Sequence, residues 1–294
     1  MPELLYLNGE TMPVAEGKVS IEDRGFQFAD GVYEVVAVYD GVPYELSEHV
    51  ERLFQSARGI ELTIPHRPEE VEDIAGRLLA ESGFKQCIIY IQVTRGAARR
   101  KHAFPVDARP TLLLYTREFT GHPAENYTQG IRTITVPDDR WSRCHIKSIA
   151  LLANVLAKER AHRAGAYEAI YYSPEGLVYE GSSSNIFCVL GGTVTTPPLS
   201  AKLLPGLTRR RLLAVARKAR IPVAERQVTL TELKSAEEVF ITGTTSEVMP
   251  VRQVDDVIIG RGTPGPVTRR LRDLMLDHIS ACCGRLRAPA GHEA

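Results

Sequence analysis

The sequence predicts a two-domain protein of the mixed α+β class, and three observations lead to this prediction. At 294 residues, of which 44% are apolar, the chain is long enough for two domains that each bury a core. Strand-like and helix-like segments mix without the regular β-α-β alternation of a doubly wound sheet. Residues 117–127 contain Gly121 and Pro123 and lack hydrophobic periodicity, which indicates a linker. The expected parts are a smaller N-terminal domain at residues 1–118, a linker at 119–127 and a larger C-terminal domain carrying Lys147 at 128–294.

The N-terminal part has the turn and capping signals of alternating strands and helices. Asn8-Gly9 between apolar residues indicates a hairpin. Ser47 can cap a helix, and Pro68 opens a second helix that ends near Gly83. The apolar face of the first helix is predicted to consist of Val50, Leu53, Phe54 and Ala57. Strands are predicted at residues 32–39, 42–46, 87–94 and 111–116.

The C-terminal part has a helical pattern directly after Lys147. Its apolar residues recur at helical spacing and are Ile149, Leu152, Ala153 and Leu156. We expect these residues to form the buried face of a helix with Lys147 at its mouth. Further helices are predicted at residues 208–219 and 267–279. Strands are predicted at residues 131–136, 169–172, 186–190, 238–242 and 254–259.

Charge and composition favour work on small molecules. Basic and acidic residues balance at 36 each, so no overall field favours nucleic acid or an anionic membrane. The N-terminus carries Glu3 where a secretory signal would carry bases, and no apolar run is long enough to span a bilayer, so a cytoplasmic location is expected. The five cysteines are odd in number and lack metal-ligand spacing, so we expect reduced thiols and no metal site.

Lys147 and Glu180 are the candidates for chemistry. Lys147 lies between Ile146 and Ile149, and burial would lower the pKa of its amine, as attack on an aldehyde requires. An isolated lysine is usually only solvated. Two Gly- and Thr-rich turns, Gly206-Leu207-Thr208-Arg209 and Thr242-Gly243-Thr244-Thr245-Ser246, have the composition of phosphate-binding turns at a helix start and after a strand. Because no Walker-type glycine-lysine loop is present, a phosphorylated cofactor such as pyridoxal phosphate is indicated.

These motifs together resemble the fold-type IV pyridoxal-phosphate enzymes, and among them the D-amino acid aminotransferases. The resemblance runs over nearly the whole chain, with motifs in the same order and at similar separations. The segments that carry it are Glu22 to Glu34, Val93-Thr94-Arg95-Gly96, Lys147 to Lys158, Glu180-Gly181-Ser182-Ser183-Ser184-Asn185 and Thr244-Thr245-Ser246-Glu247. It implies a two-domain fold-type IV architecture and pyridoxal 5'-phosphate as the cofactor.

The resemblance also implies roles for particular residues. Lys147 matches the lysine that forms the Schiff base (internal aldimine) and then moves a proton between the substrate Cα and the cofactor C4′. Glu180 matches the carboxylate that keeps the pyridine nitrogen protonated, so that the ring can act as an electron sink. The matches to the phosphate cradle are Arg52, Leu207, Thr208 and Thr244.

Substrate binding is assigned by the same resemblance to Tyr33, Arg100 and His102, which match the family's α-carboxylate trap. In the family the arginine and the histidine come from the partner subunit, which implies a homodimer. Because the loop reads Arg99-Arg100-Lys101-His102, Arg99 could take the role given to Arg100. His145 stands where related enzymes tend to carry an acid, and we assign it no role.

The expected reaction is ping-pong transamination of a D-amino acid, such as D-alanine, with a 2-oxo acid, such as 2-oxoglutarate, through pyridoxamine phosphate. A branched-chain L-amino acid aminotransferase would share Lys147 and Glu180 but should lack the set Tyr33, Arg100 and His102. An aminodeoxychorismate lyase would use the same lysine for elimination. A non-catalytic cofactor-binding protein would give Lys147 and Glu180 no reason to occur together.

Overall fold

The computed structural model describes residues 3–284 and divides into two compact units. The first unit holds the chain up to Thr120, Ile146–Ala150 and the stretch from Ile279, and the second holds Gly121–His145 and Leu151–His278. The predicted boundaries placed Lys147 in the C-terminal domain, whereas its segment has its contacts in the first unit because it pairs with a strand there. The boundaries at residues 118 and 128 stay a prediction, and residue 294 lies outside the described residues.

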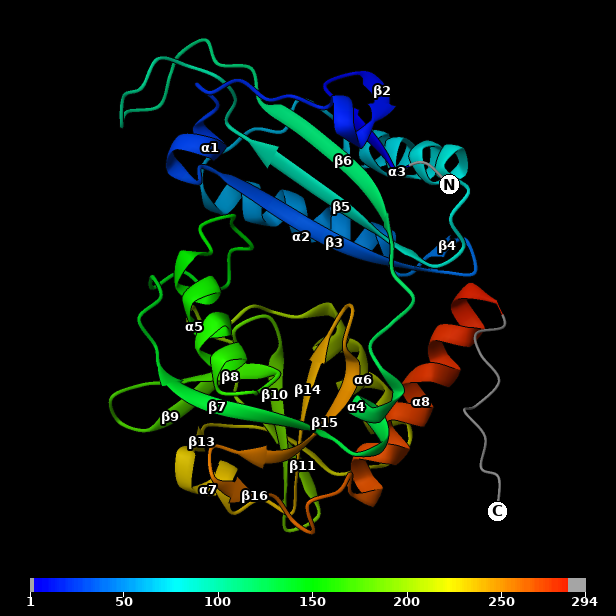
Figure 1. The fold of residues 1–294 in the computed structure, drawn as a ribbon, viewed down its shortest axis with the longest axis vertical. Coiled ribbons are helices and arrows are strands. Elements are labelled where there is room, and N and C mark those ends of the chain that lie inside the picture. Colours follow the sequence, from blue (N-terminus) through cyan, green and yellow to red (C-terminus); the bar gives the residue numbers. More distant parts are fainter. Residues whose placement is uncertain (1–2, 285–294) are drawn as a thin grey trace. The chain divides into compact units, whose positions relative to one another are not determined.

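The first unit is a six-stranded antiparallel sheet in the order β2-β1-β6-β5-β3-β4, and helices α2 and α3 pack on one of its faces (Figure 1). Its core joins Val32 and Val36 of the sheet with Val50 and Leu53 of α2 and Leu78 of α3. The strands are β1 (Leu4–Leu7), β2 (Glu10–Pro13), β3 (Gly31–Tyr39), β4 (Val42–Pro43), β5 (Cys87–Thr94) and β6 (Thr111–Glu118). The helices are η1 (Val14–Glu16), α1 (Arg24–Phe28), α2 (Leu46–Gly59) and α3 (Pro68–Ser82).

Local signals located most of these elements. The Asn8-Gly9 hairpin is confirmed, with φ of 50° and 111°, and so is the end of α3 at Gly83, whose φ is 71°. The predicted Ser47 cap is wrong, because α2 already starts at Leu46 after Glu45, and the Ser47 hydroxyl donates to Glu72 instead. The strand predicted at residues 42–46 therefore shortens to the two residues of β4.

The second unit is a ten-stranded mixed sheet that runs β12-β11-β10-β14-β15-β7-β8-β9-β13, with β16 paired to β15. Its strands are β7 (Ile131–Pro137), β8 (Glu168–Tyr172), β9 (Leu177–Gly181), β10 (Asn185–Leu190), β11 (Thr193–Thr196), β12 (Val223–Glu225), β13 (Val228–Thr229), β14 (Glu238–Gly243), β15 (Glu247–Val254) and β16 (Val257–Ile258). Its helices are α4 (Ala124–Thr128), α5 (Leu152–Arg163), α6 (Leu207–Lys218), α7 (Leu230–Lys234) and α8 (Pro266–Cys283, up to His278 in this unit). The mixed α+β class is confirmed.

Strand β10 lies inside this sheet, between β11 and β14, and is buried on both faces. Phe187 packs with Leu212 of α6 and Leu271 of α8 in one core cluster, whereas Ile186 belongs to a second cluster with Ile241 of β14. This explains why the strand predicted at residues 186–190 is a continuous apolar run. None of the helices within residues 3–284 is long and apolar enough to cross a bilayer.

Helix α5 does not bury the face that the sequence predicted. It begins at Leu152, and the side chains of Leu152, Val155 and Leu156 are 72%, 59% and 48% exposed. The helix instead packs through Ala157 and Ala161 against β7 and β8. Small alanines allow close approach to the sheet, and periodicity could not show which of two apolar stripes would be covered.

Candidate active site

Lys147 lies on an extended segment that pairs with the start of β3, not at the mouth of a helix. Its carbonyl oxygen accepts a hydrogen bond from the N–H of Tyr33 at 3.0 Å, and its own N–H donates to the hydroxyl oxygen of Ser56 at 3.1 Å. The neighbouring Ser148 forms a bridge with Val32. These bonds fix the Lys147 backbone to both β3 and α2, while Nζ lies 4.3 Å from the centroid of the Tyr33 ring. The ring face offers the ammonium a cation–π contact.

A buried charged cluster lies next to this lysine. Glu34 of β3 is fully buried, and both of its carboxylate oxygens accept from Arg52 of α2, at 2.7 and 2.8 Å. His49, one turn earlier on α2, places Nδ1 2.7 Å from the same carboxylate. The bidentate pair fixes the plane of the Arg52 guanidinium. Arg52 is therefore a buried, oriented cation.

The pKa values of this cluster follow from burial and charge. Burial raises the pKa of Glu34, but Arg52 and His49 outweigh it and bring the pKa down to about 2. Burial lowers the pKa of His49, and the positive charges of Arg52 and Lys147 lower it further, against the opposing effect of Glu34.

Glu34→Gln is expected to lower the free energy of unfolding at pH 7 by about 3–5 kcal/mol, because it leaves Arg52 buried without its counter-charge. The pKa of Glu34 lies below its ordinary value of 4.5, so the stabilisation is complete above pH 4.5 and disappears as pH falls toward 2. Urea unfolding of both proteins between pH 7 and pH 3 should therefore show a difference that shrinks with acid. The exposed Glu81→Gln on α3 is the control, and a difference independent of pH would contradict the prediction.

Arg100 and His102 lie on the loop between β5 and β6, which we call the basic loop (residues 97–109). Both contact Phe28: the Arg100 guanidinium lies 4.9 Å and the His102 ring 5.4 Å from the Phe28 ring centroid. Arg99 is exposed on the same loop. Within residues 3–284, no hydrogen bond joins Arg100 or His102 to Tyr33. The predicted carboxylate trap is thus not assembled by these contacts, and it stays a prediction.

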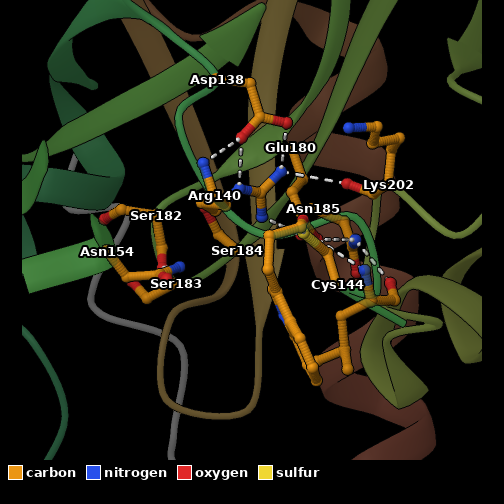
Figure 2. A network of polar contacts seen from close by, with 12 residues as sticks. Asp138, Arg140, Cys144, Asn154, Glu180, Ser182, Ser183, Ser184, Asn185 and Lys202 are labelled. Atoms are coloured by element: carbon orange, nitrogen blue, oxygen red, sulfur yellow. Dashed lines mark hydrogen bonds and ion pairs between the residues drawn. The ribbon is translucent and has the colours of Figure 1, made fainter. Parts of the chain in front are cut away.

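Glu180 on β9 is the centre of the polar network drawn in Figure 2. It is 5% exposed, and one carboxylate oxygen accepts from Arg140 at 2.5 Å. The other oxygen accepts from the side chain of Asn185 at 3.2 Å and from the N–H of Leu204 at 2.9 Å. Arg140 is itself held by Asp138 at 2.9 Å. Donors on both oxygens hold this carboxylate in one orientation.

The first turn of α6 lies beside this network. Asn185 donates to the carbonyl oxygen of Leu204 at 3.0 Å, and a Cβ on Gly206 would lie 2.0 Å from Asn185 Oδ1, so only glycine allows this close approach. No side chain caps α6, and its first turn, with Leu207 and Thr208, contains no acidic residue. The positive end of the helix dipole can therefore stabilise a negative charge.

The turn between β14 and β15 brings in the remaining predicted residue, Thr244. Thr242 pairs with Asn185 across the neighbouring strands, so this turn starts beside the Glu180 network. The Thr242 hydroxyl is buried and has no hydrogen-bond partner within the described residues. In the second unit a carboxylate, an uncapped helix start and an unsatisfied hydroxyl thus lie together, as a cofactor with a ring nitrogen and a phosphate would require. His145 is exposed, and its N–H donates to Ala201.

Sequence reasoning missed four residues that hold the site: Glu34, His49, Asp138 and Arg140. One signal was available, because Glu34 alternates with Val32 and Val36 on the buried face of β3. A carboxylate at a core position predicts a buried partner. No comparable local signal pointed to Arg140, which reaches Glu180 across 40 residues.

Comparison with known proteins identifies the class. A family model described as amino-transferase class IV matches residues 31–254. The chain is 41% identical over 269 residues to a D-alanine aminotransferase of Staphylococcus epidermidis, covering 91% of this chain and 95% of that protein. It is 41% identical over 285 residues to a D-alanine aminotransferase of Listeria monocytogenes, covering 96% and 98%.

Solved structures agree on the fold. A branched-chain amino acid aminotransferase from T.th. with pyridoxamine 5'-phosphate superimposes with a TM-score of 0.88 at 30% identity, covering 96% of this chain and 95% of that one. The Escherichia coli branched-chain enzyme gives 0.89 at 24% identity, covering 99% and 98%, and supports the fold alone. The fold is thus that of the fold-type IV aminotransferases, as the resemblance implied. The chain belongs to the amino-transferase class IV family, because the family model matches well over half of it.

Proposed function

We propose that this aminotransferase uses pyridoxal 5'-phosphate to transfer the amino group of a D-amino acid, such as D-alanine, to a 2-oxo acid, such as 2-oxoglutarate. The observation that carries the proposal is the 41% identity to D-alanine aminotransferases over nearly the whole chain. The branched-chain enzymes compared above, which share the fold, are no more than 30% identical in sequence, which leaves the L-specific alternative less favoured. An aminodeoxychorismate lyase stays the second alternative of the same fold.

The residues of the second unit fit the two ends of this cofactor. Glu180 would keep a proton on the ring nitrogen, because a fixed carboxylate stabilises the positive charge there. The uncapped N–H groups of Leu207 and Thr208 and the turn with Thr244 would hold the phosphate. When bound, the cofactor supplies an aldehyde and an electron-withdrawing ring.

The first unit would supply the proton transfer and a further phosphate ligand. Lys147 Nζ would take the proton from the substrate Cα, and the backbone bonds of Lys147 to Tyr33 and Ser56 hold the lysine in place for this step. Arg52, oriented by Glu34, would bind the phosphate as a fixed cation. Tyr33, together with Arg100 and His102, would bind the substrate α-carboxylate.

The test is the visible absorption spectrum of the cofactor-loaded protein before and after addition of D-alanine or L-alanine in parallel. We expect D-alanine, and not L-alanine, to convert the absorption band of the lysine-bound cofactor into that of the pyridoxamine form. Addition of a 2-oxo acid should restore the original band. Conversion by L-amino acids only would favour the branched-chain alternative. Pyruvate release from aminodeoxychorismate would favour the lyase.

We further propose a homodimer in which Arg100 and His102 of one subunit serve the other subunit's site. Exposed apolar side chains near the basic loop support an interface, since Ile21, Phe26 and Val106 are 79%, 75% and 96% exposed. A soluble monomer rarely leaves several large side chains so accessible at one end of a domain. The second unit adds the exposed apolar stripe of α5 described above.

A cytoplasmic location is part of the same proposal. Four of the five cysteines, Cys87, Cys144, Cys188 and Cys283, are buried thiols that form no disulfide within the described residues. Free thiols persist in a reducing compartment.

A further inference from the structure

Two motifs that resemble the family, Glu22 to Glu34 and Val93 to Gly96, contain Arg24, Asp30 and Arg95, which have so far no function in the site. In the first unit they meet at Asp30. Its carboxylate accepts from Arg24 at 2.8 Å, and from Arg95 through two nitrogens at 2.8 and 3.0 Å. The two arginine side chains are only 4% and 9% exposed. We call these three residues the Asp30 cluster.

The Asp30 cluster is bonded directly to the basic loop. Arg24 donates to the carbonyl oxygen of Lys101 at 2.6 Å and to that of His102 at 3.3 Å. The Arg95 guanidinium lies 3.6 Å from the ring centroid of Phe104 on the same loop. Arg24 thus binds the main chain at the two residues that follow Arg100.

The ends of the loop are closed by backbone contacts. The N–H of Arg24 donates to the carbonyl oxygen of Gly96 at 3.0 Å, and the N–H of Ala98 donates to Glu22 at 3.1 Å. Gly96 has a φ of 89°, and a Cβ there would lie 1.8 Å from the carbonyl oxygen of Arg109. Both ends of the basic loop therefore depend on this corner of the unit.

The charge balance of the Asp30 cluster indicates that the function of Arg24 is to bind the loop and not to neutralise Asp30. One carboxylate faces two guanidinium groups, and Asp30 already has a bidentate partner in Arg95. Burial raises the pKa of Asp30, but the hydrogen bonds and positive charges of Arg95 and Arg24 together outweigh it and lower the pKa. Arg24 is therefore not needed to neutralise Asp30. The two terminal nitrogens of Arg24 donate to the loop carbonyls instead.

We propose that Arg24, oriented by Asp30, is a positioning residue for substrate binding: it holds the main chain at Lys101 and His102, so that Arg100 and His102 keep a fixed register on the substrate carboxylate. The inference rests on the proposed function, because it takes these two side chains as carboxylate ligands. In this role Arg24 itself would touch neither substrate nor cofactor. Fixed placement matters because a shift of about 1 Å in a binding group can reduce rates by about 100-fold.

Arg24→Lys tests this role, since lysine keeps a positive charge beside Asp30 but cannot reach the carboxylate and both carbonyls at once. We expect KM for D-alanine to rise about 10- to 100-fold with kcat changed much less, and hydrogen–deuterium exchange to quicken in the basic loop. The absorption spectrum of the bound cofactor and the affinity of the protein for the cofactor should not change. The matched control is Arg269→Lys, which alters another arginine that donates to a backbone carbonyl, that of Pro264 at 2.6 Å.

Two results would overturn the inference: unchanged KM in a folded, cofactor-loaded Arg24→Lys protein, or a raised KM with unchanged exchange in the loop. A second variant, Arg24→Gln, can be measured if Arg24→Lys does not fold. It also weakens the bonds to the loop, while Arg95 still pairs with Asp30. Failure of the proposed function would look different. In that case the wild-type protein would not transaminate D-alanine, or Arg100→Met would leave KM unchanged.

Discussion

Lys147→Ala is expected to lower the rate of transamination by about four orders of magnitude, since it removes the group that moves the proton. The variant should still fold, because the bonds that hold this segment to Tyr33 and Ser56 come from the Lys147 backbone. Treatment with borohydride makes an imine between a lysine and an aldehyde permanent. Mass spectrometry should therefore find the cofactor attached to wild-type Lys147 and absent from the variant.

The chain offers a matched control in Lys158. Its ammonium also lies over a tyrosine ring, 4.4 Å from the centroid of Tyr167, and Lys158→Ala should keep both activity and cofactor attachment. Substantial turnover by Lys147→Ala, or borohydride labelling at another lysine, would contradict the role assigned to Lys147.

Lys147→Ala also provides a test of the shared site. If Arg100 serves the partner's lysine, a hybrid dimer of Lys147→Ala and Arg100→Met chains contains one intact site. Random mixing of the two inactive chains should then restore about a quarter of the wild-type activity, because half of the dimers are hybrids with one of two sites intact. If each site were built from one chain, mixing would restore nothing.

Glu180→Gln is expected to lower kcat by about 100- to 1,000-fold, the range found when one fixed electrostatic contact to a reacting group is lost. A neutral amide no longer holds a proton on the ring nitrogen, so the ring withdraws electrons less strongly. The rate of cofactor conversion by D-alanine in a stopped-flow spectrum measures this directly. The amide also places an NH2 group among the donors of Arg140, Asn185 and Leu204, which should reduce stability by about 1–3 kcal/mol.

Glu238→Gln is the control that separates the loss of stability from the loss of cofactor conversion expected for Glu180→Gln. Glu238 is a buried carboxylate in the same unit that accepts from the N–H groups of Val267 and Thr268 at 3.0 and 2.7 Å, at the start of α8. It should lose stability without a change in cofactor conversion. A wild-type conversion rate in Glu180→Gln would show that this carboxylate does not control the ring.

Much of this protein could be predicted from local pattern. Asn8-Gly9 and Gly83 require positive φ, so the hairpin and the end of α3 were predictable from short-range sterics. The strand predicted at residues 186–190 is confirmed as β10. Lys147 and Glu180 could be singled out because motifs of the family occur together and in order.

Other features depend on which elements pack together. The periodic leucines of α5 predicted a buried face, but the alanines of this helix pack against the sheet. The segment of Lys147 pairs with β3, which is far away in the sequence, and no local signal predicts this pairing. The ion pairs of Glu34 with Arg52 and of Glu180 with Arg140 join residues 18 and 40 positions apart. Residue types of the site and local turns could be inferred from the chain alone, because both depend on short-range chemistry. The buried apolar faces and the orientation of each charged group became known only from the folded molecule, because burial and long-range pairing depend on the elements that surround a residue.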